Sequence, residues 1–549
     1  MQPLKKIFIK KKGFSALTTF TVLSFIFTFT LNCASTFYRF TKAEPVTVYN
    51  DMKPIPVPHI LPEQRAAYIY DVLVRRPAVK GFEITYVHPA KDVNSLDEVP
   101  ASSWFTPRLG YKDISPQELL NGPEKMGPPQ APIKIIKAKS GGNPGFIIAD
   151  ARGKRYLIKF DPPEFPGIET TTALIVNRLY WGFGYNVPED YLYYVRKEDL
   201  IIAPESDLTQ EKVDAVLSQV APPTNGRYRA TVSLWLDGIV IGPIPPKGRR
   251  KDDLNDKIAH EDRRVLRGLR VFNAFVNHTD MRPDNTLDVY VGEEGKGYVR
   301  HYLIDFGEAF AGHGAEHDYL WDGFNHIFSF NQALTNLVTF GFNVQAWENI
   351  PYTAWKSVGA FESKTFKPEE WKEVYPYEPI RNSQAADNYW AVKIVGALNR
   401  DHLKILVDAA DYPEGGAAEY MIETLMKRRH KVLEYFLNQV SAVDAVGFSN
   451  GELHLKDVGN ILLNQNGKDT HYEIHFYNNV DKEISEKRLM SASTNQFTLP
   501  VSNRLMAEAG GYLRMEVWVW RGSEKAPSAA QFHFRSDNHS SWRLVGVVH

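Results

Sequence analysis

The N-terminal half of the chain alternates short apolar stretches with turn residues. Residues 146–150 and 156–160 are apolar and are separated by a glycine-containing turn, which predicts a β-hairpin. Residues 168–180 carry apolar side chains at helical spacing, so they predict an amphipathic helix. Residues 191–195 then predict a further strand. This region is therefore expected to form a small sheet with a helix packed on it.

The middle of the chain is dominated by helical patterns. An apolar stripe through residues 260–277 predicts a second amphipathic helix, and residues 388–407 and 417–440 have the spacing of long helices. Residues 288–300 alternate around two glycines and predict a hairpin. We expect a largely helical region with one inserted hairpin.

The pattern changes again from about residue 446 onwards. Apolar and polar residues now alternate with a period of two, which is typical of strands with one buried face. The alternating segments are 471–477, 512–520, 531–535 and 542–548. This succession of short strands predicts a β-sandwich at the C-terminal end.

The first residues of the chain have the form of a secretion signal. Several lysines and no acidic residue precede residue 13, and residues 14–31 form an uncharged, mostly apolar run. A basic start stays on the cytoplasmic side while the apolar run enters the bilayer, so the remainder of the chain is predicted to be exported. Residues 1–32 are therefore interpreted as a signal peptide.

The end of this leader, Leu31-Asn32-Cys33, resembles a bacterial lipobox, in which a peptidase cuts before a lipidated cysteine. Cys33 is the only cysteine of the chain. The resemblance implies lipidation at Cys33 and an exported, membrane-anchored lipoprotein that faces the periplasm or lies on the cell surface. Two alternatives stay open: an uncleaved signal anchor with an idle thiol, and a soluble cytoplasmic product.

Composition narrows the class of protein. The 549 residues include 64 basic and 65 acidic side chains, so the chain lacks the basic surface that nucleic-acid binding requires. Loss of the leader would take the formal net charge from -1 to -6, because the leader holds five lysines and no acid. With 43% hydrophobic residues the chain is expected to fold, and we expect a monomer that binds no nucleic acid.

Two polar segments in the middle of the chain carry candidate chemistry. Residues 277–285 read NHTDMRPDN, and residues 305–308, beyond the predicted hairpin, read DFGE. In order and spacing they resemble the catalytic loop and the metal-binding loop of the protein-kinase-like superfamily, where H-x-D-x-[K/R]-x-x-N precedes a short hairpin and D-F-G.

The resemblance implies a role for four polar residues. Asp280 would be the catalytic base facing an incoming hydroxyl group, and Arg282 would neutralise the transferring phosphoryl group. The amide oxygen of Asn285 and the carboxylate of Asp305 would hold Mg²⁺ or Mn²⁺, because such ions prefer hard oxygen ligands. The implied cofactors are this metal ion and ATP or another phosphorylated donor.

Three features further upstream resemble the nucleotide-binding half of the same superfamily. Lys159 lies between apolar residues of a predicted strand, so its ammonium would point away from the apolar face and hold phosphate groups. Glu169, at the start of the next predicted helix, would be its ion-pair partner. Gly141 and Gly142 belong to a stretch where a loop covering the phosphates would lie.

Two departures place the resemblance with divergent, atypical branches of the superfamily. Thr279 stands where many regulated kinases carry an arginine, and no Ala-Pro-Glu sequence follows Glu308. Each motif alone also has an ordinary explanation, because Asp280 and an Asp-Phe-Gly sequence can both mark turns. The prediction depends on the conjunction of these motifs in one order.

The expected fold is α+β: a two-lobed protein-kinase-like body followed by a C-terminal all-β sandwich domain. The expected parts are a signal peptide (1–32), a proline-rich tether (33–64), a flanking segment with the N-terminal lobe (65–200), a helical C-terminal lobe (201–445) and the sandwich (446–549).

The predicted function is phosphoryl transfer from a nucleotide to an unidentified hydroxyl acceptor by an exported, lipid-anchored protein. Export would place the site in a compartment expected to lack ATP. Three resolutions stay open: a different phosphorylated donor or transfer, action where triphosphate is present, or an inactive kinase-like surface lipoprotein that acts as a binding or structural module.

Overall fold

The structure is a computed structural model of the 549-residue chain. The residues that it describes are 39–42, 46, 50–62, 65–76, 86–139, 143–310, 312, 321–327, 330–350, 352–465, 470–484, 488–491, 494–536 and 542–549. The predicted signal peptide, Cys33, Gly141 and Gly142 lie outside these residues.

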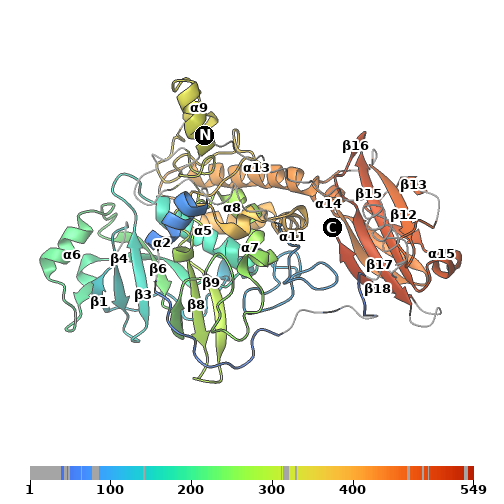
Figure 1. Ribbon diagram of the computed structural model, residues 1–549. Helices are drawn as coiled ribbons and strands as arrows, with labels where there is room; N and C mark the ends of the chain where they lie inside the picture. Colours follow the sequence, from blue (N-terminus) through green and yellow to red (C-terminus); the bar gives the residue numbers. More distant parts are fainter. Residues whose placement is uncertain are drawn as a thin grey trace, which may run out of the picture.

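A six-stranded sheet forms one end of the molecule (Figure 1). Its strands are, in spatial order, β4 (Asp190–Val195), β6 (Tyr228–Leu234), β3 (Arg155–Phe160), β2 (Gly145–Ala149), β1 (Ile133–Ala138) and β5 (Leu200–Ile202). The predicted hairpin is confirmed as β2 and β3, which pair antiparallel. On β3, Tyr156, Ile158 and Phe160 are buried on one face, so Lys159 points to the opposite face. The sheet extends beyond residue 200, where the N-terminal lobe was expected to end, because it includes β6.

The predicted helix at 168–180 is confirmed as α5 (Ile168–Gly182), which packs against the sheet. Nearly every residue of α5 is buried, so it lies between the sheet and the helical region. The shorter helix α6 (Gln210–Leu217) buries Val213 and Leu217 against the sheet core. The short helical turn η2 (Lys197–Asp199) connects β4 to β5.

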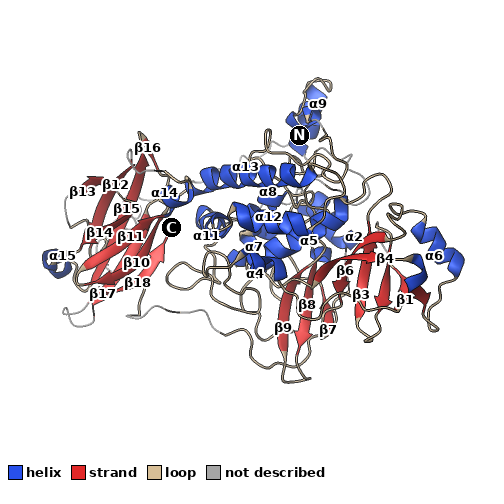
Figure 2. Cartoon of the chain, turned by 180° about the vertical axis from the view of Figure 1, so that it is seen from behind, coloured by secondary structure: helices blue, strands red, loops and turns tan. Residues whose placement is uncertain are grey.

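The central region is helical, and many of its helices share one hydrophobic core with α5. Its elements are α4 (Pro116–Asn121), η3 (His260–Asp262), α7 (Arg264–Arg267), α8 (Leu269–Val276), η4 (Pro283–Asn285), α9 (Phe330–Val338), η5 (Ala346–Asn349), α10 (Glu378–Arg381), α11 (Ala385–Gly396), α12 (Arg400–Ala409) and α13 (Ala417–Leu437). Figure 2 shows α7, α8, α11, α12 and α13 between the two β regions.

Two of the predicted long helices are wrong as single helices. The stretch 260–277 is broken at Arg263, whose backbone is extended, and Asp92 accepts hydrogen bonds from the first amides of α7. The stretch 388–407 divides into α11 and α12, because the Asn399 side chain accepts from the amide of His402 and starts a new helix. The helix predicted at 417–440 is confirmed as α13.

A three-stranded sheet holds the two loops that carry the motifs. It has the order β7 (Ile239–Gly242), β8 (Thr286–Val291) and β9 (Tyr298–Leu303). The predicted hairpin is confirmed as β8 and β9, which pair Thr286 with Leu303. The loop before β8 and the loop after β9 therefore meet at one edge, where the Ile304 amide donates to the Asn285 carbonyl at 3.0 Å.

The C-terminal region forms two antiparallel sheets around a common core, as the alternation predicted. One sheet contains β10 (Val443–Ser449), β11 (Glu452–Asp457) and β14 (Gln496–Pro500); the other contains β12 (Thr470–Tyr477), β13 (Arg488–Ser491), β15 (Tyr512–Arg521), β16 (Glu524–Lys525), β17 (Ala530–Ser536) and β18 (Trp542–Val548). The region is not purely β, because it includes the short helices α14 (Val458–Leu462) and α15 (Asn503–Glu508).

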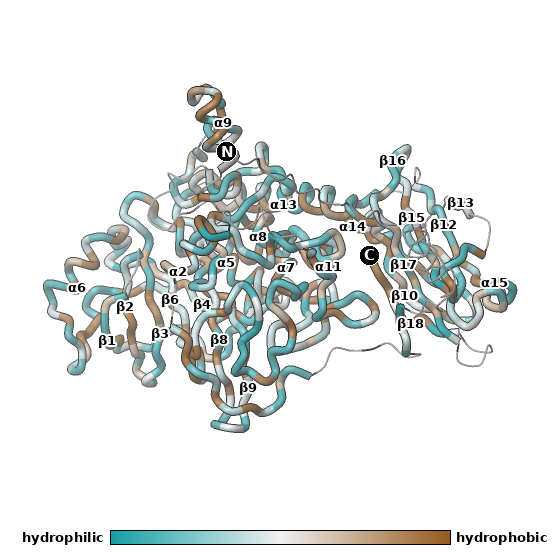
Figure 3. Tube along the Cα trace, in the orientation of Figure 1, coloured by the Kyte–Doolittle hydropathy of each residue, from teal (hydrophilic) through white to brown (hydrophobic). Residues whose placement is uncertain are grey.

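Helix α9 stands out from the body, and Figure 3 shows hydrophobic residues along it. Leu337 is 72% exposed, and Phe340 and Phe342, just beyond the helix, are 88% and 86% exposed. Among the described residues, none of the helices has the length and hydropathy needed to cross a membrane.

Near the beginning of the described chain, α2 (Arg65–Tyr70) continues into one π-helical turn, η1 (Asp71–Arg75). Further upstream, the Phe40 amide donates to the Tyr512 hydroxyl at 3.1 Å, so residues 39–42 lie against the C-terminal sandwich.

Candidate functional site

The polar residues singled out in the sequence converge from separate elements. Lys159 comes from β3 and Glu169 from the first turn of α5, whereas Asp305 follows β9. The Lys159 Nζ atom lies 2.5 Å from Asp305 Oδ1 and 3.4 Å from Glu169 Oε1. Asp280 and Asn285 lie in the loop between α8 and β8, whose end is bonded to the segment that leads to Asp305.

Lys159 is held between two carboxylates and is nearly removed from water, with 12% of its side chain exposed. Burial by itself lowers the pKa of an ammonium group. Here the negative charges of Asp305 and Glu169 outweigh burial and raise the pKa of Lys159, so the lysine is a permanent cation. The Asp305 side chain is 39% exposed, so burial opposes its ionisation only in part, and Lys159 lowers the pKa of this carboxyl group below its ordinary value.

Glu169 is positioned by a cap on the first turn of α5. The buried Asp161 carboxylate accepts from the backbone amides of Glu169 and Thr170 at 3.0 and 2.9 Å. Burial raises the pKa of Glu169 to about 7, with Lys159 opposing the shift. The amide group of Asn143, from the turn between β1 and β2, donates to the other oxygen of Glu169. The ion pair is therefore tied both to α5 and, through Asn143, to the residue pair that precedes β2.

Gly307 allows the loop after β9 to approach Glu169. A Cβ atom at this position would lie 2.6 Å from Cγ and 2.9 Å from Cδ of Glu169, which is closer than real Cβ contacts. The glycine of the Asp-Phe-Gly motif is thus required by the packing of this loop on α5.

Asp305 and Phe306 turn the chain at this site. Asp305 has a positive φ of 62°, an uncommon conformation that aspartate tolerates better than most residues. Phe306 is buried and packs 5.0 Å from the ring of Tyr180 and 6.0 Å from that of His278. Burial lowers the pKa of His278 to about 4, so this histidine is neutral near pH 7 and supports the loop by packing.

Asp280 is enclosed and fully engaged. It is 3% exposed. Arg282 Nη1 donates to one carboxylate oxygen, and the Asn285 Nδ2 group donates to the other at 2.7 Å. Asn285 Nδ2 also donates to the Asp280 carbonyl at 2.7 Å. These two hydrogen bonds use the nitrogen of the Asn285 amide group, and its oxygen is the atom with the chemistry of a cation ligand.

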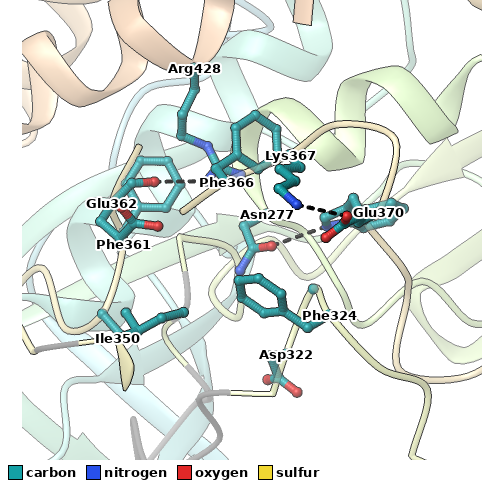
Figure 4. Close-up of a pocket in the computed structure, with 13 residues that line it drawn as sticks. Asn277, Asp322, Phe324, Ile350, Phe361, Glu362, Phe366, Lys367, Glu370 and Arg428 are labelled. Carbon is teal, nitrogen blue, oxygen red and sulfur yellow. Dashed lines mark hydrogen bonds and ion pairs between the residues drawn. The ribbon is translucent and has the colours of Figure 1, made fainter. Parts of the chain in front are cut away.

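Arg428 of α13 lines a pocket together with Asn277, Phe361, Glu362 and Phe366 (Figure 4). Its guanidinium donates to the last carbonyls of α8, Ala274 O at 2.7 Å and Phe275 O at 2.9 Å, and to Glu362 O at 2.9 Å. It also lies 3.5 Å from the ring centre of Phe366. Burial lowers the pKa of Arg428 to about 9. The end of α8 is therefore fixed to α13.

The turn that follows α8 has a second support. Asn277 adopts a left-handed conformation with φ of 51°, and its Oδ1 accepts from the Trp371 indole at 3.0 Å. This turn leads directly to His278 and Asp280, so the position of the Asp280 loop depends on contacts with distant segments.

Sequence reasoning missed two polar residues of the site. Glu308 follows the Asp-Phe-Gly motif, and burial together with the charges of Asp280 and Asp305 raises its pKa well above the ordinary value. Lys139 follows β1 and donates to the Asn143 carbonyl at 3.2 Å; burial and the nearby Lys159 lower its pKa. Glu308 could have been found from its position directly after the Asp-Phe-Gly motif, whereas nothing in the sequence around Lys139 indicates that it lies near the site.

The residues fit a hard divalent cation of the Mg²⁺ or Mn²⁺ type in donor chemistry. One carboxylate, Asp305, and one amide oxygen, Asn285, lie on adjoining loop ends, and such ions commonly take one or two protein carboxylates and complete their shell with water and phosphate. In the described part of the chain, no group of three or more His, Cys, Asp or Glu side chains is arranged to hold a metal ion.

Comparisons with known proteins give little further information. A scan against models of protein families finds no match, and a search of curated proteins finds no significant one. Among solved structures, the Helicobacter pylori proinflammatory kinase CtkA matches at 10% identity and a TM-score of 0.29, over 53% of this chain and 92% of that chain. A golgi casein kinase matches at 11% identity and a TM-score of 0.29, over 68% and 91%. A TM-score of 0.29 does not establish a common fold, so the chemistry of the site has to be argued from its own geometry.

Proposed function

We propose that the protein is a kinase-like phosphotransferase that moves a phosphoryl group from a nucleotide to a hydroxyl acceptor. The observation that carries the proposal is the meeting of Lys159, Glu169 and Asp305 from three separate elements, with Lys159 Nζ 2.5 Å from Asp305 and 3.4 Å from Glu169. A buried cation between two carboxylates is costly unless its position is needed or well compensated. Such groups are candidates for a functional site.

Each residue has a task that its chemistry permits. Lys159 would bind the phosphate oxygens of the donor, and the turn that carries Asn143 would cover them. Asn285 and Asp305 would hold Mg²⁺ or Mn²⁺, which when bound would neutralise charge on the phosphates. Arg282 would stabilise the charge of the transferring group.

Transfer then requires a base for the acceptor. The acceptor oxygen forms a bond to the terminal phosphorus as the bond from that phosphorus to the bridging oxygen of the donor breaks. The acceptor proton passes to the Asp280 carboxylate, and the leaving diphosphate keeps the electron pair of the broken bond.

Nucleotide binding provides the first test. We expect the full-length protein to be stabilised by ATP with Mg²⁺ or Mn²⁺, by about 2.7 kcal/mol at one hundred times the dissociation constant. The variant Asp305→Ala should lose this stabilisation. The control Asp481→Ala changes a partly exposed aspartate of the sandwich and should keep it. An equal thermal shift in wild type and Asp305→Ala, or no shift with any nucleotide, would contradict the proposal.

The alternative of an inactive binding module also has a supporting observation. Both carboxylate oxygens of Asp280 are engaged by Arg282 and Asn285, so the loop is satisfied without a substrate. Nucleotide binding without any turnover, in wild type and in variants that expose Asp280, would favour this alternative.

We also propose that the protein is exported and anchored to a membrane through a lipid on Cys33. The leader and the single cysteine support this proposal. Labelled fatty acid should enter the wild-type protein in cells and should not enter Cys33→Ser; label that persists in Cys33→Ser would refute lipidation at this residue. The same stability assay, carried out with ATP and with other phosphorylated compounds, would identify the donor that the protein binds.

A further inference from the structure

A segment from near the beginning of the described chain lies against the loop that carries Asp280. Helix α2 and the turn η1 lie against the Asp280 loop and the segment around residue 376. Arg65, Tyr68 and Arg76 make contacts and Val72 is buried; the four residues follow one another at intervals of three or four. This spacing places the four side chains along one face of a helix.

The contacts hold the segment at several points. The Tyr68 hydroxyl donates to the Pro376 carbonyl at 3.2 Å, and Arg76 Nη1 lies 2.6 Å from Glu378 Oε2. Tyr68 is 9% exposed and Val72 is 2% exposed. Tyr70, on the opposite face of the same helix, is 58% exposed. The segment is therefore docked by one face, with an acidic partner at each end: Asp284 for Arg65 and Glu378 for Arg76.

Charged side chains connect this helix to Asp280. Arg65 Nε lies 3.8 Å from Asp284 Oδ2, and the same oxygen lies 3.4 Å from Arg282 Nε. Arg282 in turn pairs with the Asp280 carboxylate. The signs alternate along the row, so each member favours the placement of the next.

This arrangement conflicts with the proposed transfer step. An acceptor hydroxyl must reach a free oxygen of Asp280, yet Asp280 is 3% exposed and both its oxygens are engaged. Access therefore requires Arg282 or Asn285 to move away from this carboxylate.

We propose that residues 65–76 act as an intramolecular inhibitor: they occupy the acceptor side of the site and hold Arg282 on Asp280. This inference rests on the proposed phosphotransferase function. Asp284 and Glu378 together suit a short helix with a basic residue at each end, and the chain supplies that helix itself.

Substitution of Tyr68 tests the inference in the full-length protein. Tyr68→Ala removes the central anchor, and Tyr70→Ala is its matched control on the exposed face. Two quantities are measured: hydrogen exchange of amides 280–285, and ATP turnover to water with Mg²⁺ or Mn²⁺, which needs no identified acceptor. We expect Tyr68→Ala to increase the exchange and to raise turnover at least fivefold, and Tyr70→Ala to change neither.

Exchanging the charges of Arg76 and Glu378 provides a second test that does not depend on the folding of Tyr68→Ala. Arg76→Glu should raise turnover as Tyr68→Ala does, and the pair Arg76→Glu with Glu378→Arg should restore the low wild-type rate. Increased exchange with unchanged or lower turnover would overturn the inhibitory role. Unchanged exchange in Tyr68→Ala would overturn the docking itself.

The failure of the proposed function would look different. If neither wild type nor Tyr68→Ala is stabilised by nucleotide and metal ion, phosphotransfer fails and the inhibitory role fails with it. Hydrogen exchange still decides whether the helix covers the Asp280 loop in that case.

Discussion

At the scale of single residues, the position of the Lys159 ammonium group depends on a few direct contacts. The ammonium is shared by Asp305 and Glu169, and Glu169 is in turn held by the Asp161 cap and by Asn143. Removing one partner from such a buried cluster leaves an uncompensated charge, which is more costly than losing an exposed pair. Small displacements of these side chains should therefore affect ligand binding before they affect the fold.

Replacement of Gly307 tests this sensitivity. In Gly307→Ala, the added methyl group would meet the Glu169 side chain at 2.6 to 2.9 Å, so Glu169 must move away from Lys159. We expect at least a tenfold weaker affinity for nucleotide with metal ion, and a loss of stability of about 1–3 kcal/mol. Calorimetric titration and urea unfolding measure the two effects. Gly415→Ala, where a Cβ atom would meet nothing within 4 Å, should change neither, and normal affinity in Gly307→Ala would contradict the assigned packing.

At the scale of elements, the Asp280 loop depends on the junction between α8 and α13. Arg428 is buried and satisfies three backbone carbonyls, two of them at the end of α8. A helix end leaves carbonyls without partners inside the helix, so the guanidinium completes α8 and joins it to the neighbouring helix and to the segment near Glu362.

Substitution of Arg428 should loosen this junction. Arg428→Met leaves the three carbonyls without their donor, and we expect a loss of about 2–4 kcal/mol in the free energy of unfolding. Arg428→Lys keeps a cation but not the planar guanidinium group, so its free energy of unfolding should lie between those of the wild type and Arg428→Met. Hydrogen exchange should rise at residues 274–280. Arg400→Met, which removes two surface ion pairs, with Glu419 and Glu423, should leave stability almost unchanged. An equal loss of stability in Arg428→Met and Arg400→Met would contradict the role of Arg428 in joining α8 to α13.

At the scale of the whole molecule, a buried polar network joins the sandwich to the helical body. His549 Nδ1 lies 3.0 Å from Asp97 Oδ2, and its Nε2 lies 3.4 Å from Asp444 Oδ1. Asp444 also lies 3.1 Å from Lys393 of α11. Although burial disfavours the charged ring, hydrogen bonds to Asp444 and Asp97 raise the pKa of His549 to about 9.

The pH dependence of stability should reveal this network. Because the folded protein holds the His549 proton more tightly than the unfolded chain does, its contribution is complete below the ordinary pKa of about 6.5 and is lost as pH rises through about 9. The contribution is of the order of 3 kcal/mol. Urea unfolding between pH 6 and pH 10 should show this decline in wild type and not in His549→Gln. His471→Gln, a substitution on the sandwich, should keep the wild-type profile; a parallel decline in His549→Gln would exclude His549 as its source.

The sequence by itself determined the local elements and the order of the motifs. The hairpin of β2 and β3, helix α5, the β8–β9 hairpin and the C-terminal strands follow from hydrophobic periodicity, because burial of one face imposes a period on neighbouring residues. The spacing of Asp280, Asn285 and Asp305 was also readable, since a short loop and a tight hairpin restrict where these residues can lie.

Only the tertiary structure decided which distant groups meet. Asp92 caps the start of α7 inside the stretch predicted as one helix at 260–277, Gly307 is required by Glu169, and Tyr68 donates to the Pro376 carbonyl, 308 positions away. The hydrophobic periodicity of the sequence predicts none of these contacts, because each depends on how separate elements pack against one another. Periodicity shows that a residue is buried, whereas the packed chain selects the atom that it is buried against.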